Sequence, residues 1–183
     1  MRSIGRLLCM CGLMMLADLS FLQGQTLEFV VDEVSAAPGS TVNVDVKANN
    51  FTAIQGYQGT IRFDTSKLIF VSLNSPTAGI NNSFGNPGQG LIPLDAATFT
   101  WVDFSGIGQS RPDSTSMFRI TFQVKANAPA GMTPVTLNSS VTQLAYSVGT
   151  GIITPLVNQG FVDVESSGLE FIVEEEVGLP GDT

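Results

Sequence analysis

The segment GYQGTIRFDTSKLIFVSL at 56–73 decides the fold, because apolar and polar residues alternate along its first run, and a polar turn separates this run from a second, mostly apolar one. In an extended strand, side chains two positions apart share a face. Tyr57, Ile61 and Phe63 therefore share one face of the first run. The opposite face carries the polar residues of that run, which are Gln58, Thr60 and Arg62. This period predicts a strand with one buried face, since the apolar residues of a helix recur every three to four positions.

The same alternation recurs along most of the chain, whereas helical periodicity is almost absent. We expect strands at 27–34, 41–48, 54–63, 68–73, 97–104, 117–126, 133–138, 141–147 and 160–165, and 151–156 could add a short one. Gly, Pro, Asn and Ser separate these runs. About nine short strands joined by such turns predict an all-β protein, an antiparallel sandwich of two sheets.

The run at 117–126 shows the alternation most clearly. Its predicted inward residues are Phe118, Ile120, Phe122 and Val124. Its predicted solvent-facing residues are Arg119, Thr121, Gln123 and Lys125. Burying each large apolar side chain contributes about 1.5–3 kcal/mol of transfer free energy, so these stripes set the strand register.

The stretch PTAGINNSFGNPGQGLIPLD at 76–95 lacks this alternation and is rich in Gly, Asn and Pro. It predicts a long loop that contains at most one short turn or edge strand. Such a loop is either functional or a mobile cover for one end of the sandwich, and both interpretations stay open.

The segment LEFVVDEVSAAPGST at 27–41 returns as LEFIVEEEVGLPGDT at 169–183, with eight identities in fifteen positions. The offset of 142 residues is the length of one domain. We therefore expect a module at 25–165, a linker at 166–168 and the start of a second, truncated module at 169–183, which makes the chain a fragment of a tandem array.

The first 24 residues carry Arg2 and Arg6, an apolar run from Leu7 to Leu16, and then a more polar stretch. This order is typical of a secretory signal peptide, and it predicts a secreted or cell-surface protein. The two cysteines lie inside this segment, so the mature chain contains no thiol and no disulfide.

Composition excludes several classes of function. Without histidine or a mature cysteine, the chain cannot form a Ser-His-Asp triad, a Cys-His pair or the common zinc sites. Asp95 and Asp103 flank one expected strand, but we interpret them as solvated carboxylates rather than a glycosidase pair. The sequence predicts no enzyme, no metal site and no cofactor.

Charge and hydropathy limit the partners. Removing the signal peptide leaves 6 basic and 15 acidic side chains, a formal charge of −9. That sign disfavours nucleic-acid binding. No segment after the signal peptide is apolar enough to span a membrane.

Several segments, in this order, resemble the cohesin family, the receptor half of the cohesin–dockerin pair. They are the opening strand with its Pro38-Gly39 turn and VNVDVKA at 42–48; GYQGTIRFDTSKLIFVSL at 56–73; FTWVDFSG at 99–106; MFRITFQVKANAPAGMTPVTL at 117–137; and QGFVDV at 159–164. Cohesin-like modules also occur, often in tandem, in bacterial surface proteins outside cellulosomes.

The resemblance implies a nine-stranded jelly-roll sandwich that binds a dockerin helix pair on one flat sheet face. The dockerin carries the calcium, and this chain contains no D-x-[DN]-x-[DN]-G loop of its own. In well-studied cohesins the third strand presents an Asn and an Asp, two residues apart, to the dockerin. Gly56 and Gln58 occupy those places here.

The candidate binding residues lie on the solvent-facing sides of the third, fifth and sixth expected strands. They are Gln58, Thr60, Arg62, Arg119, Thr121 and Gln123. Trp101, the one tryptophan, is either an exposed anchor for a partner or a buried core residue.

We therefore predict a non-catalytic docking or scaffolding module that binds dockerin-type partners in extracellular or cell-surface assemblies, with a possible link to polysaccharide degradation. Direct polysaccharide binding is the alternative, and it requires a planar aromatic strip. A structural spacer or adhesin repeat is the third interpretation, and it requires no specific partner.

Overall fold

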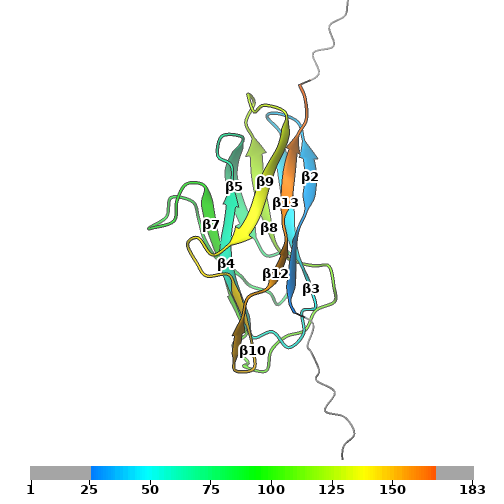
Figure 1. Cartoon of the computed structure of the whole chain (residues 1–183), viewed down its shortest axis with the longest axis vertical. Helices are drawn as coiled ribbons and strands as arrows, with labels where there is room; N and C mark the ends of the chain where they lie inside the picture. The colour runs from blue at the N-terminus through cyan, green and yellow to red at the C-terminus, as the bar shows by residue number, and fades with distance from the viewer. Residues whose placement is uncertain (1–25, 168–183) are drawn as a thin grey trace, which may run out of the picture.

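The computed structural model describes residues 26–167, which form two β-sheets packed face to face (Figure 1). The five-stranded sheet has the order β12-β1-β3-β8-β5. Its strands are β1 (Glu28–Val31), β3 (Thr41–Asn49), β5 (Leu68–Asn74), β8 (Thr115–Val124) and β12 (Leu156–Asn158).

The eight-stranded sheet is built around β4 (Gly56–Phe63). One edge of β4 pairs with β7 (Ala96–Val102), which pairs in turn with β6 (Ser83–Gly85). The other edge pairs first with β10 (Ala145–Val148) and then with β9 (Gly131–Asn138). The remaining strands are β2 (Glu33–Ala36), β11 (Gly151–Ile153) and β13 (Gly160–Val164).

The prediction of an all-β sandwich is confirmed, with differences in strand number and direction. The described residues contain thirteen strands rather than about nine. The pairs β1–β12 and β2–β13 are parallel, so both sheets are mixed rather than purely antiparallel. The stretch 76–95 contributes β6 as an edge strand, and the strand expected at 141–147 begins only at Ala145.

The strand expected at 27–34 divides at Asp32, where the chain passes from one sheet to the other. The Asp32 amide donates to the Asp45 carbonyl at 2.9 Å, and its carboxylate accepts from Lys47 Nζ at 2.7 Å. At Gly160, between β12 and β13, the chain again passes from the five-stranded sheet to the eight-stranded sheet. A Cβ at Gly160 would lie 2.3 Å from the Asp32 carbonyl oxygen, so only glycine fits this crossing.

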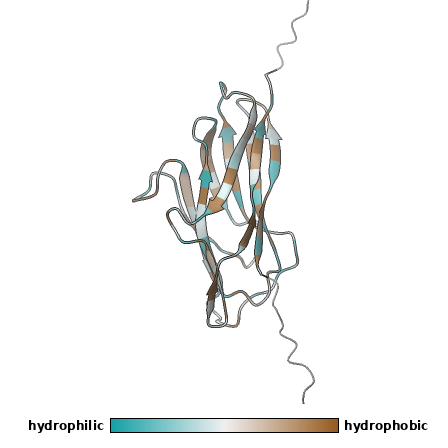
Figure 2. Ribbon diagram, viewed as in Figure 1, coloured by the Kyte–Doolittle hydropathy of each residue, from teal (hydrophilic) through white to brown (hydrophobic). Residues whose placement is uncertain are grey.

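The core lies between the two sheets, and the alternation of hydropathy along the strands is visible in Figure 2. Ile61, Phe118 and Phe122 are completely buried, as their predicted inward positions require. The rings of Phe99 and Phe118 come from opposite sheets and lie with centroids 4.6 Å apart. Apolar burial of this kind is the main favourable term in folding.

The beginning of the long loop is fixed to the core. Ile80 is completely buried, and the Tyr57 hydroxyl donates to Asn82 Oδ1 at 2.7 Å. Burial raises the pKa of the Tyr57 phenol well above its ordinary value. The later part of the loop projects from the molecule, and Leu91 is 97% exposed.

The expected signal peptide (1–24) and truncated second module (169–183) lie outside the described residues, as does the end of the linker expected at 166–168. In the described part, no helix is long and apolar enough to cross a membrane.

Candidate docking face

The outer face of the eight-stranded sheet is organised in rows that run across its strands. One row places Val102 opposite Gly56, Gly56 opposite Ser147, and Ser147 opposite Ile152. The next row places Thr100 opposite Gln58, and Gln58 opposite Ala145. Because paired residues on neighbouring strands point to the same side, these side chains form one continuous surface.

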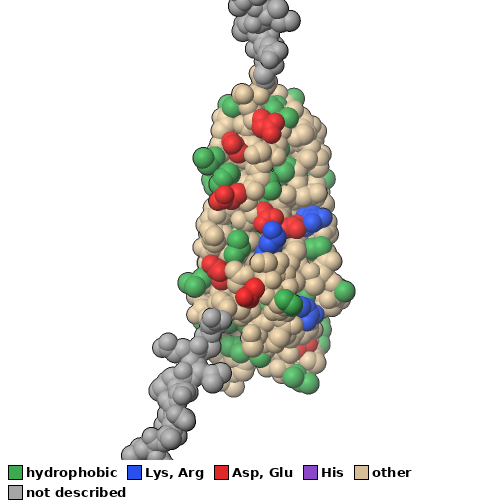
Figure 3. Space-filling model, turned by 90° about the vertical axis from the view of Figure 1, so that its right-hand side faces the viewer, with side chains coloured by type: hydrophobic (Ala, Val, Ile, Leu, Met, Phe, Trp, Pro, Cys, Tyr) green, Lys and Arg blue, Asp and Glu red, His purple; other side chains and the backbone are tan. Residues whose placement is uncertain are grey.

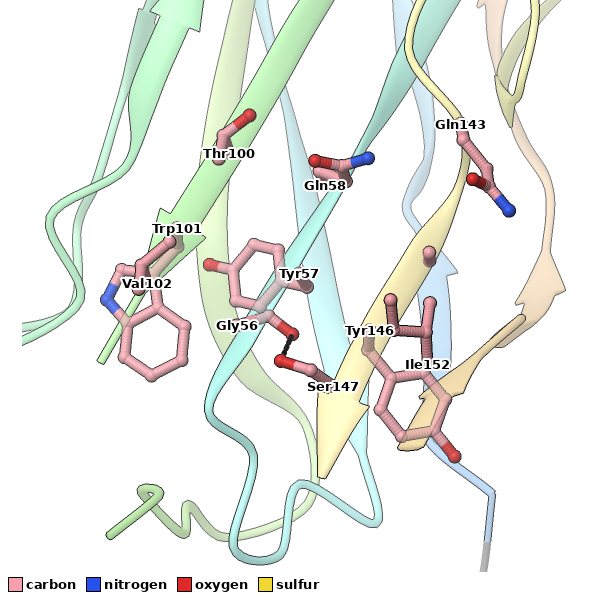
Figure 4. Close-up of a pocket in the computed structure, with 11 residues that line it drawn as sticks. Gly56, Tyr57, Gln58, Thr100, Trp101, Val102, Gln143, Tyr146, Ser147 and Ile152 are labelled. Carbon is pink, nitrogen blue, oxygen red and sulfur yellow. Dashed lines mark hydrogen bonds between the residues drawn. The ribbon is translucent and has the colours of Figure 1, made fainter. Parts of the chain in front are cut away.

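A hollow of about 200 Å³ lies at the centre of these rows. Gly56 contributes no side chain, and Val102 and Ile152 stand on either side of it with exposed fractions of 48% and 76% (Figure 4). The Ser147 hydroxyl lies 3.5 Å from the Gly56 carbonyl oxygen. The hollow therefore has a backbone floor and two apolar walls.

None of the residues around the hollow carries a charge. They are Gly56, Tyr57, Gln58, Thr100, Trp101, Val102, Gln143, Ala145, Tyr146, Ser147 and Ile152. The polar groups among them are amides and hydroxyls, which can hydrogen-bond but cannot compensate a buried ion.

Two of the predicted binding residues, Gln58 and Arg62, lie on this face, and Gln58 lines the hollow. Arg62 lies two rows away, where it forms an ion pair with Asp95. The Arg62 and Asp95 side chains are 33% and 38% exposed, so the pair is accessible to solvent and to a partner.

Thr60 was predicted to be accessible, and the structure corrects this. Its side chain is completely buried because residues 139–144 fold over it. Its hydroxyl accepts from the amides of Val141 and Thr142 at 3.1 and 2.8 Å and donates to the Thr142 carbonyl at 3.1 Å. Thr60 holds this loop in place and presents no side chain to a partner.

Trp101 is a core residue and not an exposed anchor, because its side chain is only 4% exposed. Its ring stacks on Tyr57 with centroids 5.4 Å apart and lies against Phe51 at 5.8 Å. Of the two interpretations of Trp101, the structure therefore supports the buried core residue, and Trp101 is not one of the partner-binding residues. Trp101 lies beneath the outer face of the eight-stranded sheet, next to the hollow.

Arg119, Thr121 and Gln123 lie on the outer face of the five-stranded sheet, on the opposite side of the molecule from Gln58 and Arg62. The expectation that all the candidates share one surface is wrong, because β8 pairs with β3 and β5 rather than with β4 or β7.

On the outer face of the five-stranded sheet, several polar side chains form hydrogen bonds with each other across neighbouring strands. Arg119 donates to both oxygens of Asp45, at 2.5 and 2.9 Å, and Thr121 donates to Asn43 at 2.8 Å. Figure 3 shows the side of the molecule that lies to the right in Figure 1, and basic side chains lie beside acidic ones there as well. The hydrogen bonds from Arg119 hold the pKa of Asp45 below its ordinary value.

Asp95 and Asp103 do not form a catalytic pair. They precede and follow β7, and eight residues of extended chain span roughly 26 Å, whereas glycosidase carboxyls lie roughly 5–10 Å apart. Asp103 Oδ2 accepts from the Ser105 hydroxyl at 2.6 Å and the Gly108 amide at 2.8 Å, and these hydrogen bonds lower its pKa. Within 26–167, no three acidic, His or Cys side chains are grouped to hold a metal.

Sequence reasoning missed most residues around the hollow. Thr100 and Val102 follow the same alternation that buries Phe99 and Trp101, so their outward direction could have been read from the sequence. Ile152 could not have been found, because the hairpin of β10 and β11 brings it beside Gly56 from almost one hundred residues away.

The described residues therefore form a two-sheet β-sandwich with an uncharged hollow on the outer face of one sheet. A comparison with protein-family models then matches residues 27–164 to the cohesin domain. The chain belongs to the cohesin family, a family of non-catalytic scaffolding modules. The resemblance found in the sequence is confirmed.

Solved structures show the same fold. The solution structure of CaCohA2 from Clostridium acetobutylicum matches with a TM-score of 0.66 and 19% identity, over 79% of this chain and 94% of that chain. The Coh-OlpA–Doc918 structure, a type I cohesin–dockerin complex from Clostridium thermocellum, matches with a TM-score of 0.64 and 19% identity, over 76% and 99%.

A non-cellulosomal cohesin from the archaeon Archaeoglobus fulgidus matches with a TM-score of 0.59 and 17% identity, over 77% of this chain and 92% of that chain. A comparison with curated protein sequences finds no match.

Proposed function

We propose that this chain is a docking module that binds a dockerin-type protein on the outer face of its eight-stranded sheet. The observation that carries the proposal is the hollow around Gly56 and Gln58. By the alignment on the Arg62-Phe63-Asp64 turn, these two places on β4 carry an Asn and an Asp partner contact in the cohesins that the chain resembles, so Gly56 and Gln58 depart from the family's contact pattern. The calcium required for binding belongs to the dockerin.

The opposite face is a weaker candidate. Two pairs of its polar side chains, Asp45–Arg119 and Asn43–Thr121, already bind each other, so a partner that uses them would have to displace those contacts. Breaking internal hydrogen bonds to form external ones yields little net free energy. The rows around Gly56 carry no such ladder of charged pairs.

Direct polysaccharide binding finds less support than protein docking. Stacking on sugar rings requires a planar strip of exposed aromatic side chains. Within the described residues, Trp101 and both tyrosines are buried. Phe104, which is 97% exposed, is the one aromatic side chain there that is neither buried nor half-buried. A single ring in a turn does not make a strip.

The wider setting is also part of the proposal. The repeated segment at 169–183 supports a tandem array, in which each module would hold one partner. The N-terminal segment supports secretion, and therefore assembly outside the cell or on its surface. Dockerin-bearing enzymes of polysaccharide degradation would be natural partners for such an array.

A binding assay with the chain as bait tests the docking proposal. The candidates are dockerin-containing proteins from the source organism, offered with calcium and with a chelator, and insoluble cellulose and chitin are offered in parallel. We expect capture of a dockerin protein that calcium chelation abolishes. Retention on polysaccharide without any dockerin partner, or no retention at all, would contradict the proposal.

A further inference from the structure

The hollow on the docking face has the properties of a socket for one side chain. Its volume is about 200 Å³, and an apolar cavity of roughly 150 Å³ is large enough to bind benzene. One Leu, Ile, Val or Met side chain from a partner would therefore fill the space between Val102 and Ile152. A whole helix would not enter it, since a helix with its side chains is roughly 10 Å across.

The chemistry of the walls selects an apolar occupant. Val102 and Ile152 present exposed methyl groups, and Ala145, which is only 5% exposed, lines the hollow across the sheet from Gln58. A charged side chain placed there would lose its hydration without meeting an opposite charge, because no residue around the hollow is ionised.

Gly56 keeps the hollow open. A Cβ at this position would lie 3.0 Å from the Trp101 carbonyl oxygen and 3.3 Å from Ser147 Oγ, at the floor of the space. Any larger side chain at position 56 would occupy the volume itself. The absence of a side chain at the first residue of β4 is thus the feature that turns a flat sheet into a socket.

We infer that the hollow receives one aliphatic side chain, Leu, Ile, Val or Met, carried on a helix of the protein partner, and that this contact anchors the complex. The inference rests on the proposed docking function and deepens it. Most of the affinity for the partner would come from burying this apolar side chain in the hollow. Thr100, Val102 and Ile152 would then determine which side chain fits. Charge plays a minor part in this recognition.

The test compares identical substitutions on the two outer faces of the full chain. Thr100→Tyr fills the hollow, whereas Thr121→Tyr places the same ring on the five-stranded sheet. Ile152→Ser removes a wall, whereas Ile69→Ser removes a comparably placed apolar residue, 45% exposed, from the other face. The probe is the calcium-loaded dockerin captured in the assay above, and its affinity is measured by titration calorimetry.

We expect Thr100→Tyr and Ile152→Ser each to weaken binding by about tenfold or more, the value of burying one aliphatic side chain. Thr121→Tyr and Ile69→Ser should change affinity by less than about twofold, since surface substitutions outside a contact have small effects. Raising the salt concentration from 50 to 500 mM should change the wild-type affinity by less than about threefold, because apolar contacts are not screened.

The possible failures are distinguishable. Dockerin binding that survives Thr100→Tyr unchanged would overturn the socket and leave the docking proposal standing. Capture of no dockerin would overturn both. Retention on cellulose or chitin that Thr100→Tyr abolishes would show that the hollow holds a sugar, and would overturn the aliphatic occupant. Thermal unfolding of every variant verifies that a loss of binding is not a loss of fold.

Discussion

The two outer faces of this sandwich are built by the same strand alternation, yet they differ in what their polar side chains do. On the five-stranded sheet, Asp45 and Arg119 satisfy each other across neighbouring strands. On the eight-stranded sheet, the rows around Gly56 leave an uncharged hollow between exposed methyl groups. A face that is satisfied internally contributes to stability, whereas a face with an unfilled socket is available to a partner.

The largest loss of stability should come from a substitution at Gly160, where the chain passes from one sheet to the other. Gly160→Ala places a Cβ 2.3 Å from the Asp32 carbonyl oxygen and 2.6 Å from that of Val31. Because both contacts are with backbone, we expect a loss of about 3 kcal/mol of unfolding free energy, at the upper end of overpacking effects. Chemical denaturation of the variant measures it.

Gly151→Ala is the matched control, since a Cβ there meets its first neighbour at 3.5 Å. It should change the unfolding free energy by less than about 0.5 kcal/mol. Equal stability of the two variants would mean that the sheets are not tied together at Gly160.

A second substitution tests whether Thr60 stabilises the fold rather than contacting a partner. Thr60→Val removes the hydroxyl that accepts from the amides of Val141 and Thr142, which leaves these groups without that partner. We expect a loss of about 1–3 kcal/mol in denaturant unfolding. Thr98→Val, on the residue paired with Thr60 across the sheet, should cost less than about 0.5 kcal/mol. A smaller loss for Thr60→Val than for Thr98→Val would contradict the assigned role.

The Asp45–Arg119 pair on the five-stranded sheet should contribute to the free energy of unfolding in a way that depends on pH. Arg119 holds the pKa of Asp45 below its ordinary value of 3.8, so the ionised carboxylate stabilises the folded state above that pH. This stabilisation is lost as the pH falls through the lowered pKa. It is worth about 0.5–1 kcal/mol, since the pair is partly exposed.

Denaturant midpoints from pH 6 to pH 2 measure this contribution. The wild type should lose about 0.5–1 kcal/mol more than Asp45→Asn below pH 4. Dockerin affinity at neutral pH should be the same for both proteins. A weaker complex for Asp45→Asn would move the binding site to the five-stranded sheet.

The smallest effect concerns the charged pair at the border of the docking face. Arg62→Gln breaks the solvent-exposed pair with Asp95, and we expect a change in dockerin affinity of less than about threefold, seen only at low salt. Arg119→Gln, on the other face, should leave affinity unchanged. A loss of more than about tenfold for Arg62→Gln would make charge, rather than the hollow, the main determinant of binding.

The sequence predicted which side of each strand is buried more reliably than which strands are neighbours. Alternation alone placed Ile61 and Phe118 in the core and Gln58 and Arg119 on the surface, since the direction of a side chain is a local property. Alternation carried no information on which strands pair. The prediction that the exposed residues of β8 and β4 form one surface was therefore wrong, because β8 pairs with β3 and β5.

Long-range contacts account for the other errors. Thr60 is buried by a loop eighty residues later in the chain, and no local pattern reveals that cover. The break at Asp32 depends on its contacts with Asp45 and Lys47 of β3. The hollow itself needs strands from three separate parts of the sequence, so the sequence could suggest Gln58 but not the socket beside it.

Mapping the interface by NMR on the methyl-labelled chain tests the central claim most directly. Titration with the calcium-loaded dockerin should shift the methyl signals of Ala145, Val102 and Ile152 and leave those of Ile69 and Val71 in place. Shifts confined to Ile69, Val71 and the Thr121 methyl, with the signals around Gly56 unchanged, would place the partner on the five-stranded sheet and contradict the account.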